Sequence, residues 1–224
     1  MNPSQKPLAP LRILRLIASP NGNASESLKL SERILHALTV RAGIRGIELT
    51  DIDLNTLSPV DATYAHALAH PSEIATEDQK GTLCRSDQMI ILLNACDVLV
   101  IATPMHNYSV PSPLKAWIDH VVRVGKTFLS TSKGKVGTLL DRPVYVAVAT
   151  GGYISGERAR QPDFLRPYLS AVLKTIGLNQ VHYFTVEGTA KGTDALKTAQ
   201  KIGYDDVHTF FHEEIEARTH ETVA

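Results

Sequence analysis

A serine-rich turn follows the first apolar run of the chain and has the residue types of an anion-binding site. The turn reads ASPNGNASESLKL (18–30), and it places Ser19, Ser25 and Ser27 at or just before the start of an amphipathic segment. Serine hydroxyls and the free N–H groups of a helix N-terminus can bind a phosphate without a lysine. The same serines can instead simply cap their own helix. The turn alone leaves a monophosphate site and a plain cap equally open.

A second irregular segment, TPMHNYSVPSPLKAWID (103–119), follows another apolar run. Three prolines in so short a stretch argue against a loop that only redirects the chain. Pro104 and Met105 would form a rigid apolar shelf. The side-chain amide of Asn107 has both donors and an acceptor for the rim of a heterocycle. This segment therefore predicts a binding surface for a flat ring.

A third polar segment, ATGGYISG (149–156), contains a glycine pair. Gly151 and Gly152 lack a Cβ, so their N–H groups can approach the edge of a ring without a clash. A glycine pair is also common in ordinary turns. A monophosphate and a flat ring system bound at one place together predict flavin mononucleotide, FMN.

The elements that must position these segments can be read from hydrophobic periodicity. Strands are predicted at 11–19, 44–53, 97–103, 142–150 and 180–188. Helices are predicted at 27–43, 76–95, 112–125, 162–177 and 193–220. We expect 54–75 to be an irregular surface excursion and 126–142 to be a loop. Five strands alternating with helices predict an α/β fold, a parallel sheet with helices on both faces, and ligands bind such sheets at the carboxyl edge.

The motifs of other nucleotide-binding α/β proteins do not occur in the first turn. There is no GxGxxG, which argues against a classical dinucleotide site, and no GxxxxGK[ST], which excludes a Walker phosphate loop. A pair of acids after the first strand, which a phosphoacceptor domain would need, is also missing.

Composition excludes further classes. The chain has 224 residues, 43% of them hydrophobic, and 23 basic residues balance 23 acidic ones. A neutral chain without a basic run has no basic patch that would bind nucleic acid or an anionic membrane. No apolar run is long enough to form a transmembrane helix. We expect a disordered leader at 1–10, without the apolar core of a signal peptide, and a single domain at 11–220. These features predict a cytoplasmic protein.

Several cysteine, histidine and charged side chains could suggest a redox or metal site, but an ordinary structural role is the simpler interpretation. Cys84 and Cys96 are twelve residues apart, which fits neither a redox motif nor a metal site, so reduced thiols are expected. His66 and His70 lie four apart, but no third ligand is spaced nearby, so we predict a helix face and no metal site. An ion pair is predicted between Asp119 and Arg123. Trp117 is expected to pack in the core or at a subunit contact.

Three stretches resemble the motifs of a known family. SESL, TPMHNYSVPSPLKAWIDHVVRVGKTF and ATGGY are similar to segments of the FMN-dependent NADH:quinone oxidoreductases, also called azoreductases, of the flavodoxin-like superfamily. The resemblance extends over residues 11–215, and its long middle motif is specific. It implies a flavodoxin-like, doubly wound sheet of five parallel strands in the order 2-1-3-4-5. It also implies a homodimer with each active site formed between the subunits.

By position, the resemblance implies three sets of FMN contacts. The phosphate loop would comprise Ser19, Ser25, Glu26 and Ser27. The isoalloxazine shelf would comprise Pro104, Met105, His106 and Asn107. The loop on the pyrimidine side would comprise Ala149, Thr150, Gly151 and Gly152.

The chain departs from the family pattern at two of these positions. Glu26 stands where many relatives have a neutral residue such as glutamine. A carboxylate beside a phosphate is unfavourable, so we expect only the Glu26 N–H to contact the phosphate and the side chain to turn to solvent. His106 stands where many relatives have tyrosine. It could donate a proton to the reduced quinone, because imidazole titrates near neutrality, or it could be a polar substitute for the ring at the pocket lip.

The activity implied is hydride transfer from NADH or NADPH to a quinone or an azo compound. Donor and acceptor would use one pocket in turn, which requires a ping-pong order. No catalytic acid or base is strictly required, since the cofactor performs the hydride transfer and solvent can protonate the product. Two alternatives remain: a flavodoxin-type electron carrier, and an FMN reductase that releases free reduced flavin.

Overall fold

A computed structural model of the protein describes residues 8–69 and 81–223. The main sheet consists of β1 (Leu11–Ile17), β2 (Ile47–Asp53), β3 (Val98–Pro104), β6 (Val144–Thr150) and β7 (Val181–Glu187). The helices are α1 (Glu26–Ala42), α2 (Ala62–Ala69), α3 (Thr82–Ala95), α4 (Ser112–Val121), α5 (Leu165–Ile176) and α6 (Thr193–Val223). Two short strands, β4 (Phe128–Thr131) and β5 (Gly134–Gly137), form a separate hairpin.

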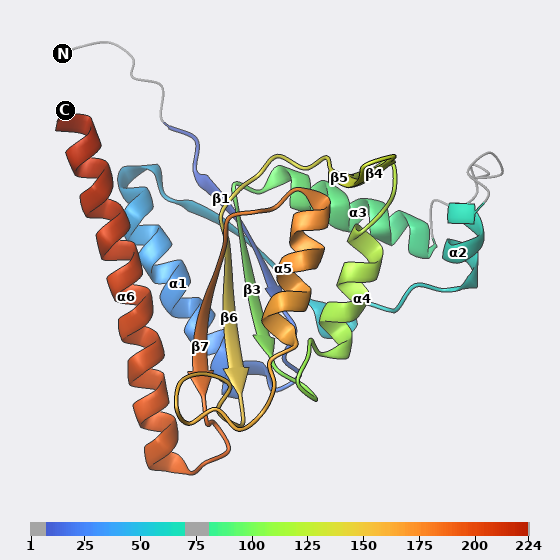
Figure 1. The fold of residues 1–224 in the computed structure, drawn as a ribbon. Helices are drawn as coiled ribbons and strands as arrows, with labels where there is room; N and C mark the ends of the chain where they lie inside the picture. The colour runs from blue at the N-terminus through green and yellow to red at the C-terminus, as the bar shows by residue number, and fades with distance from the viewer. Residues whose placement is uncertain (1–7, 70–80, 224) are drawn as a thin grey trace.

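The five strands of the main sheet are all parallel and lie in the order β2-β1-β3-β6-β7. Counted along the main sheet alone, this is the predicted order 2-1-3-4-5, which is confirmed. All the strands therefore end at one edge, where the arrowheads of the labelled strands meet in Figure 1. The register places Ile17 of β1 beside Ala102 of β3, and Pro104 of β3 beside Ala149 of β6. The three predicted binding segments therefore leave the sheet from adjacent strands.

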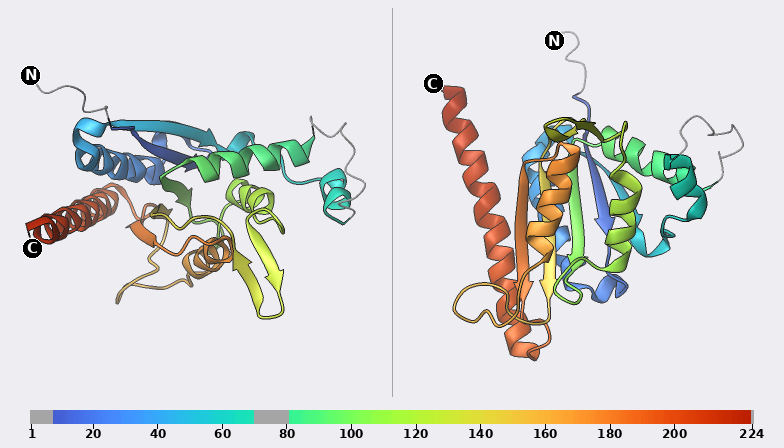
Figure 2. Two further views of the ribbon diagram at one scale, coloured as in Figure 1. Left: turned by 90° about the horizontal axis from the view of Figure 1, so that it is seen from above. Right: turned by 45° about the vertical axis from the view of Figure 1, so that its right-hand side comes forward.

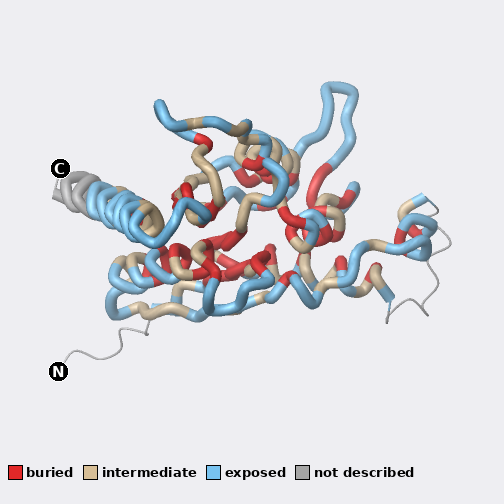
Figure 3. Tube along the Cα trace, turned by 90° about the horizontal axis from the view of Figure 1, so that it is seen from below, coloured by how far each residue is buried: buried red, intermediate tan, exposed pale blue. Residues whose placement is uncertain are grey.

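Helices cover both faces of the sheet, as the strand–helix alternation predicts (Figures 1 and 2). Alternate strand residues point to opposite faces, so neighbouring residues belong to different cores. Ile13 packs with α1 and α6, whereas Leu14 packs with α3, α4 and α5. Both β3 and β6 are buried along almost their whole length, and the buried segments concentrate between the helical layers in Figure 3. This double burial explains why these strands read as continuous apolar runs.

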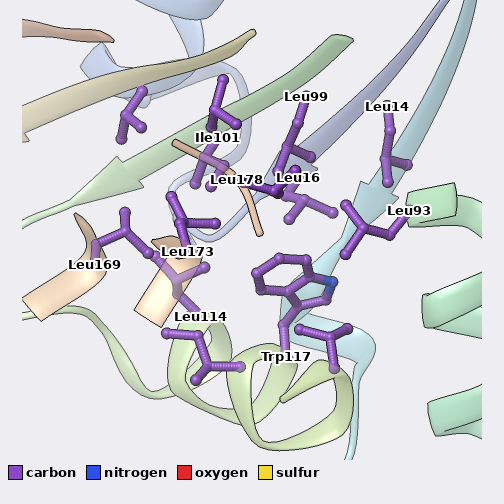
Figure 4. Packing of buried hydrophobic residues seen from close by; sticks show 14 of the residues in the cluster. Leu14, Leu16, Leu93, Leu99, Ile101, Leu114, Trp117, Leu169, Leu173 and Leu178 are labelled. Atoms are coloured by element: carbon purple, nitrogen blue, oxygen red, sulfur yellow. The ribbon is translucent and has the colours of Figure 1, made fainter. Parts of the chain in front are cut away.

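The core beneath α4 is built around Trp117, which is fully buried. In Figure 4 its indole ring extends from α4 towards the sheet, with Leu93, Leu16 and Leu114 around it. The packing role expected for Trp117 is therefore confirmed within this chain. The helix carrying Trp117 starts directly after the shelf segment, so its burial anchors that segment to the sheet.

Part of the segment expected to be irregular is helical. Within 54–75, the structure has a short 3-10 turn at Leu54–Thr56 and the helix α2, while 70–75 lie outside the described residues. Asp61 caps α2 by accepting the N–H of Tyr64 at 2.8 Å. Tyr64 and Ala67, three apart, pack on Leu83. The prediction missed α2 because an eight-residue helix carries too few apolar positions for a periodic signal.

The expected loop at 126–142 contains the β4–β5 hairpin. Leu129 and Val136 are cross-strand partners in it, and Gly134 has a φ of +113° at its turn. The hairpin projects from the body of the molecule in the left view of Figure 2. Four-residue strands containing two glycines gave no recognisable alternation in the sequence.

The predicted leader falls mainly on residues 1–7, which lie outside the described residues, as do 76–80 of the helix predicted at 76–95. Residues 8–10 are exposed, and Arg45 donates hydrogen bonds to the carbonyls of Ala9 and Pro10. In the described ranges, no helix has both the length and the apolar character that crossing a bilayer requires. Cys84 and Cys96 are both unbridged, as predicted.

Candidate flavin site at the carboxyl edge of the sheet

The serine turn forms a cap and leaves backbone donors in front of it. Ser25 is the N-cap of α1, and its Oγ accepts the N–H of Leu28 at 3.2 Å. Ser27 is fully buried, and its Oγ lies 3.0 Å from that of Ser25. The first main-chain bond of the helix runs from Lys29 N–H to Ser25 O. The N–H groups of Glu26 and Ser27 precede it, in the position where helices bind anions. The plain cap is therefore present, and it is compatible with an anion site.

Ser19 begins the same turn at the end of β1. It is buried, and its Oγ accepts the N–H of Asn21 at 3.3 Å. Its carbonyl accepts a hydrogen bond from the side-chain amide of Asn55 at 3.0 Å. Asn55 lies in the 3-10 turn after β2, which the sequence did not connect with the site. The serine turn is thus fixed by a hydrogen bond from the segment that follows the neighbouring strand β2.

The side chain of Glu26 does not turn to solvent, so that expectation is wrong. Only 12% of it is exposed, and both carboxylate oxygens are bonded. Oε1 accepts from Lys29 Nζ at 2.7 Å, and Oε2 accepts from Gln200 Nε2 at 2.6 Å. The hydrogen bond with Glu26 raises the pKa of Lys29 and keeps it charged. The carboxylate is thereby neutralised within the protein and need not be hydrated.

The shelf segment makes an unusual tight turn. Met105 N–H donates to Ala149 O at 2.8 Å, which extends the pairing of β3 and β6 by one step. His106 and Ser109 then exchange two N–H···O bonds of 3.0 Å. Between them, Asn107 and Tyr108 have φ values of +48° and +69°. Left-handed backbone is tolerable for asparagine but costs of order 1–3 kcal/mol for a bulky residue such as tyrosine. Strain of this kind clusters at functional sites.

The side chains of this turn are well exposed. His106, Asn107 and Tyr108 all face solvent, while Pro104 and Met105 are half-buried. The carbonyl of Tyr108 accepts the N–H of Phe164 at 2.9 Å, which ties the turn to the segment before α5. Tyr108 was not predicted as a site residue, although it lies within the motif 103–119.

The glycine loop after β6 is held by the chain that follows β7. The carbonyls of Thr150, Gly151 and Gly152 accept N–H groups from residues 188–190 at 2.9–3.3 Å. A Cβ on Gly152 would lie 2.5 Å from Oε1 of Gln161, whereas one on Gly151 would only touch Ala190 at 3.4 Å. A side chain at position 152 would therefore have to displace the carboxamide of Gln161, a reason for glycine that differs from the predicted approach of a ligand ring.

Two further residues that the sequence did not reveal fix this loop. Gln161 Nε2 donates to Thr150 Oγ1 at 3.0 Å and lies 4.0 Å from Met105 Sδ, so it bridges the glycine loop and the shelf. Glu187, the last residue of β7, accepts the N–H groups of Ile154 and Ser155 at 2.8 and 3.2 Å. The only sequence signal for Glu187 was a carboxylate at a strand end facing a glycine-rich loop.

The structure brings all three predicted segments together. Ala18 N–H donates to Ala102 O at 2.9 Å, which joins the serine turn to β3, and Met105 joins the shelf to β6. A phosphate monoester fits the serine turn, because the turn offers serine hydroxyls and the N–H groups of Glu26 and Ser27, and the Glu26 carboxylate is neutralised by Lys29. A flat ring fits the exposed turn of the shelf beside Thr150. Together, the donors and the apolar surface present at this edge suit FMN.

One predicted ion pair differs from the structure. Asp119 and Arg123 do not pair with each other: Asp119 pairs with Lys115 at 2.6 Å and Arg123 with Asp87 at 2.7 Å. Arg123 is buried and reaches α3, which offers it a carboxylate and the hydroxyl of Ser86. The helix face predicted for His66 and His70 stays a prediction, since His70 lies outside the described residues.

Comparison with known proteins agrees with this architecture. The family model for the flavodoxin-like fold matches residues 11–207. The chain is 42% identical over 185 residues to FMN-dependent NADH:quinone oxidoreductase 4 of Pseudomonas fluorescens, covering 83% of this chain and 88% of that protein. It is 39% identical over 184 residues to FMN-dependent NADH:quinone oxidoreductase 5 of Burkholderia lata, covering 82% and 88%.

Solved structures share the fold at lower identity. An azoreductase from Bacillus anthracis superposes with a TM-score of 0.77 at 21% identity, covering 90% of this chain and 99% of that one. An FMN-dependent NADH-azoreductase from the same species, in complex with FMN, superposes with a TM-score of 0.73 at 23% identity, covering 89% and 98%.

Proposed function

The chain belongs to the flavodoxin-like family of FMN-dependent NADH:quinone oxidoreductases, and from this membership we propose that it transfers hydride from NADH or NADPH to a quinone or azo acceptor with bound FMN as its cofactor. The observation that carries the proposal is the meeting of a serine-capped helix N-terminus, a strained shelf turn and a glycine loop on the adjacent strands β1, β3 and β6. In open α/β sheets, ligands bind at the carboxyl ends of the strands, at the point where the strand order reverses, which here lies between β1 and β3.

Each segment has a proposed task. Ser19, Ser25 and Ser27, with the N–H groups of Glu26 and Ser27, would hold the phosphate. Pro104, Met105, His106 and Asn107 would support the isoalloxazine ring. Ala149, Thr150, Gly151 and Gly152 would border its pyrimidine side. Support comes from the burial of the three serines and from the hydrogen bonds that join the three loops.

The cofactor, when bound, would accept hydride from the nicotinamide and pass it to the acceptor. The residues of this chain would orient the ring and leave one of its faces open to both substrates in turn. That single access favours a ping-pong order. The main-chain donors of the glycine loop would offer a polar edge where negative charge develops, which is the usual way a protein assists such a cofactor.

We also propose that the protein is a cytoplasmic homodimer. The hairpin supports the dimer, because its cross-strand pair Leu129 and Val136 is about half exposed, 50% and 52%. Exposed apolar side chains side by side on a projecting hairpin suit a protein contact. The unbridged Cys84 and Cys96 suit a reducing compartment. A mass measurement by light scattering after gel filtration tests the dimer, and a monomeric mass would contradict it.

Cofactor identity tests the proposal as a whole. We expect the purified protein to bind one FMN per chain without a covalent bond, and to retain it through gel filtration. Heat should release a flavin that migrates as FMN. Release of FAD, or no flavin uptake at all, would contradict the proposal, whereas loss of reduced flavin during filtration would favour an FMN reductase. Initial rates at several fixed acceptor concentrations should give parallel double-reciprocal lines if the order is ping-pong.

A further inference from the structure

Glu26 places a negative charge inside the proposed phosphate loop. It is the first residue of α1 and lies between Ser25 and Ser27 in sequence. The positive end of a helix dipole stabilises an anion, so the carboxylate of Glu26 and a bound phosphate compete for the same end of α1. If the carboxylate faced the phosphate, the two like charges would repel each other. The rotamer of Glu26 therefore matters for cofactor affinity.

Two side chains hold this carboxylate. Lys29, one turn along α1, neutralises it through a 2.7 Å ion pair. Gln200 reaches it from α6 at 2.6 Å, across 174 residues of sequence. Lys29 lies on the same helix as Glu26, whereas Gln200 belongs to a separate helix packed against α1. The amide of Gln200 carries no charge and donates to Oε2 of Glu26, so it would act on a bound phosphate through the position of Glu26.

We propose that Gln200 is a positioning residue for the cofactor phosphate, because it holds the Glu26 carboxylate against α6 and out of the phosphate loop. The inference rests on the proposed function and adds a residue of α6 to those that affect binding of the phosphate. When Gln200 is absent, Oε2 of Glu26 loses its partner, and the carboxylate, then held by Lys29 alone, can turn towards the bound phosphate. FMN should be weakened, while riboflavin, which has no phosphate, should be unaffected.

Equilibrium binding of FMN and riboflavin to the apoprotein tests this positioning role. Gln200→Leu should weaken FMN by about threefold to tenfold, as expected for like charges brought within several ångströms in a solvated site. Its affinity for riboflavin should stay within about twofold of the wild-type value. Gln200→Ala is the second variant, in case leucine disturbs the packing of α6. Thr209→Leu, an exposed neutral position on the same helix, is the matched control and should change neither ligand.

The decisive comparison removes the charge of Glu26. In a Glu26→Gln background, Gln200→Leu should no longer weaken FMN, because no carboxylate remains to be held. Glu26→Gln alone should leave FMN as tight as in the wild type or tighter, even though the apoprotein melts at a lower temperature without the ion pair.

Three results would overturn the positioning role. One is equal weakening of FMN and riboflavin by Gln200→Leu, and another is equal weakening of FMN in both backgrounds; either would make Gln200 a purely structural contact. The third is wild-type affinity for FMN in both Gln200 variants. Failure of the wild-type protein to bind any flavin would instead contradict the proposed function, so the two failures are distinguishable.

Discussion

Gln161 donates a hydrogen bond from Nε2 to Thr150 Oγ1 at 3.0 Å, and this contact connects the end of β6 with a segment eleven residues further along the chain. The carboxamide of Gln161 also occupies the space in which a side chain at position 152 would lie. The geometry of the glycine loop therefore depends on a residue outside it.

Gly152→Ala should displace the Gln161 side chain and break its bond to Thr150. The new Cβ would meet the flexible end of Gln161, so the protein should still fold. We expect FMN binding to weaken by about five- to tenfold, the effect of one lost hydrogen bond of about 1 kcal/mol. Gln161→Ala should weaken FMN similarly. The two changes together should cost no more than either alone, and fully additive losses would contradict the shared cause.

Ser27→Ala should separate phosphate binding from helix capping. Ser25 caps α1 through Leu28, so Ser25→Ala should lower both the stability, by about 1 kcal/mol, and the FMN affinity. Ser27 accepts no such cap bond. We expect Ser27→Ala to weaken FMN tenfold to a hundredfold, since a charge-assisted hydrogen bond contributes roughly 1.5–3 kcal/mol, and to leave riboflavin unchanged. Calorimetric titration with each flavin measures this, and an equal effect on both ligands would point to the cap alone.

His106→Tyr should retain most of the activity with a shifted acceptor preference, and His106→Ala should raise the KM for the acceptor. The reason is that His106 is exposed on the shelf turn, so a larger ring at this position need not displace a buried neighbour. The competing hypothesis, that His106 donates the proton, predicts that both variants lose acceptor turnover alike. Separate measurement of flavin reduction and reoxidation decides, because neither hypothesis predicts more than a small effect on reduction.

The free energy of unfolding should fall at low pH because Asp97 becomes protonated. Arg12 donates to this carboxylate at 2.7 Å, and that hydrogen bond, opposed by burial, holds the pKa of Asp97 below its ordinary value. The ionised Asp97 therefore stabilises the folded protein. This stabilisation is fully present above the unfolded pKa of about 3.9 and is lost as the pH falls through the lower pKa of the folded state. Asp97→Asn should be less stable than the wild type at pH 7.

The difference between Asp97→Asn and the wild type should disappear well below pH 4. Urea midpoints at a series of pH values, with Asp205→Asn as an exposed control, measure this. A constant difference across the whole range would show that the carboxylate charge is not the cause.

The alternation of apolar runs was sufficient to predict the parallel sheet and most of its helices, because strands such as β3 and β6 are buried on both faces and are almost entirely apolar. It was insufficient for α2 and for the β4–β5 hairpin. Those elements are short, and tertiary contacts such as Tyr64 on Leu83 decide their conformation.

The composition of the candidate site could be predicted only where its residues are close in sequence. Ser25, Glu26 and Ser27 form one turn, and the shelf forms another. Gln161, Glu187 and Gln200 come from distant parts of the chain, and each acts through hydrogen bonds that the fold creates. The expectation that the Glu26 side chain turns to solvent was wrong for the same reason, since the sequence around position 26 does not indicate a hydrogen-bond partner on α6.

The central claim is that this protein passes hydride from a nicotinamide to a quinone through bound FMN, and the two half-reactions test it most directly. FMN-loaded protein should be mixed with NADH without oxygen in a stopped-flow instrument, and a para-quinone added after the nicotinamide has been removed. We expect NADH to bleach the flavin absorbance by one equivalent per chain and the quinone to restore it completely while the flavin stays bound. Flavin that NADH does not bleach, or that the quinone does not reoxidise faster than free reduced flavin, would contradict it.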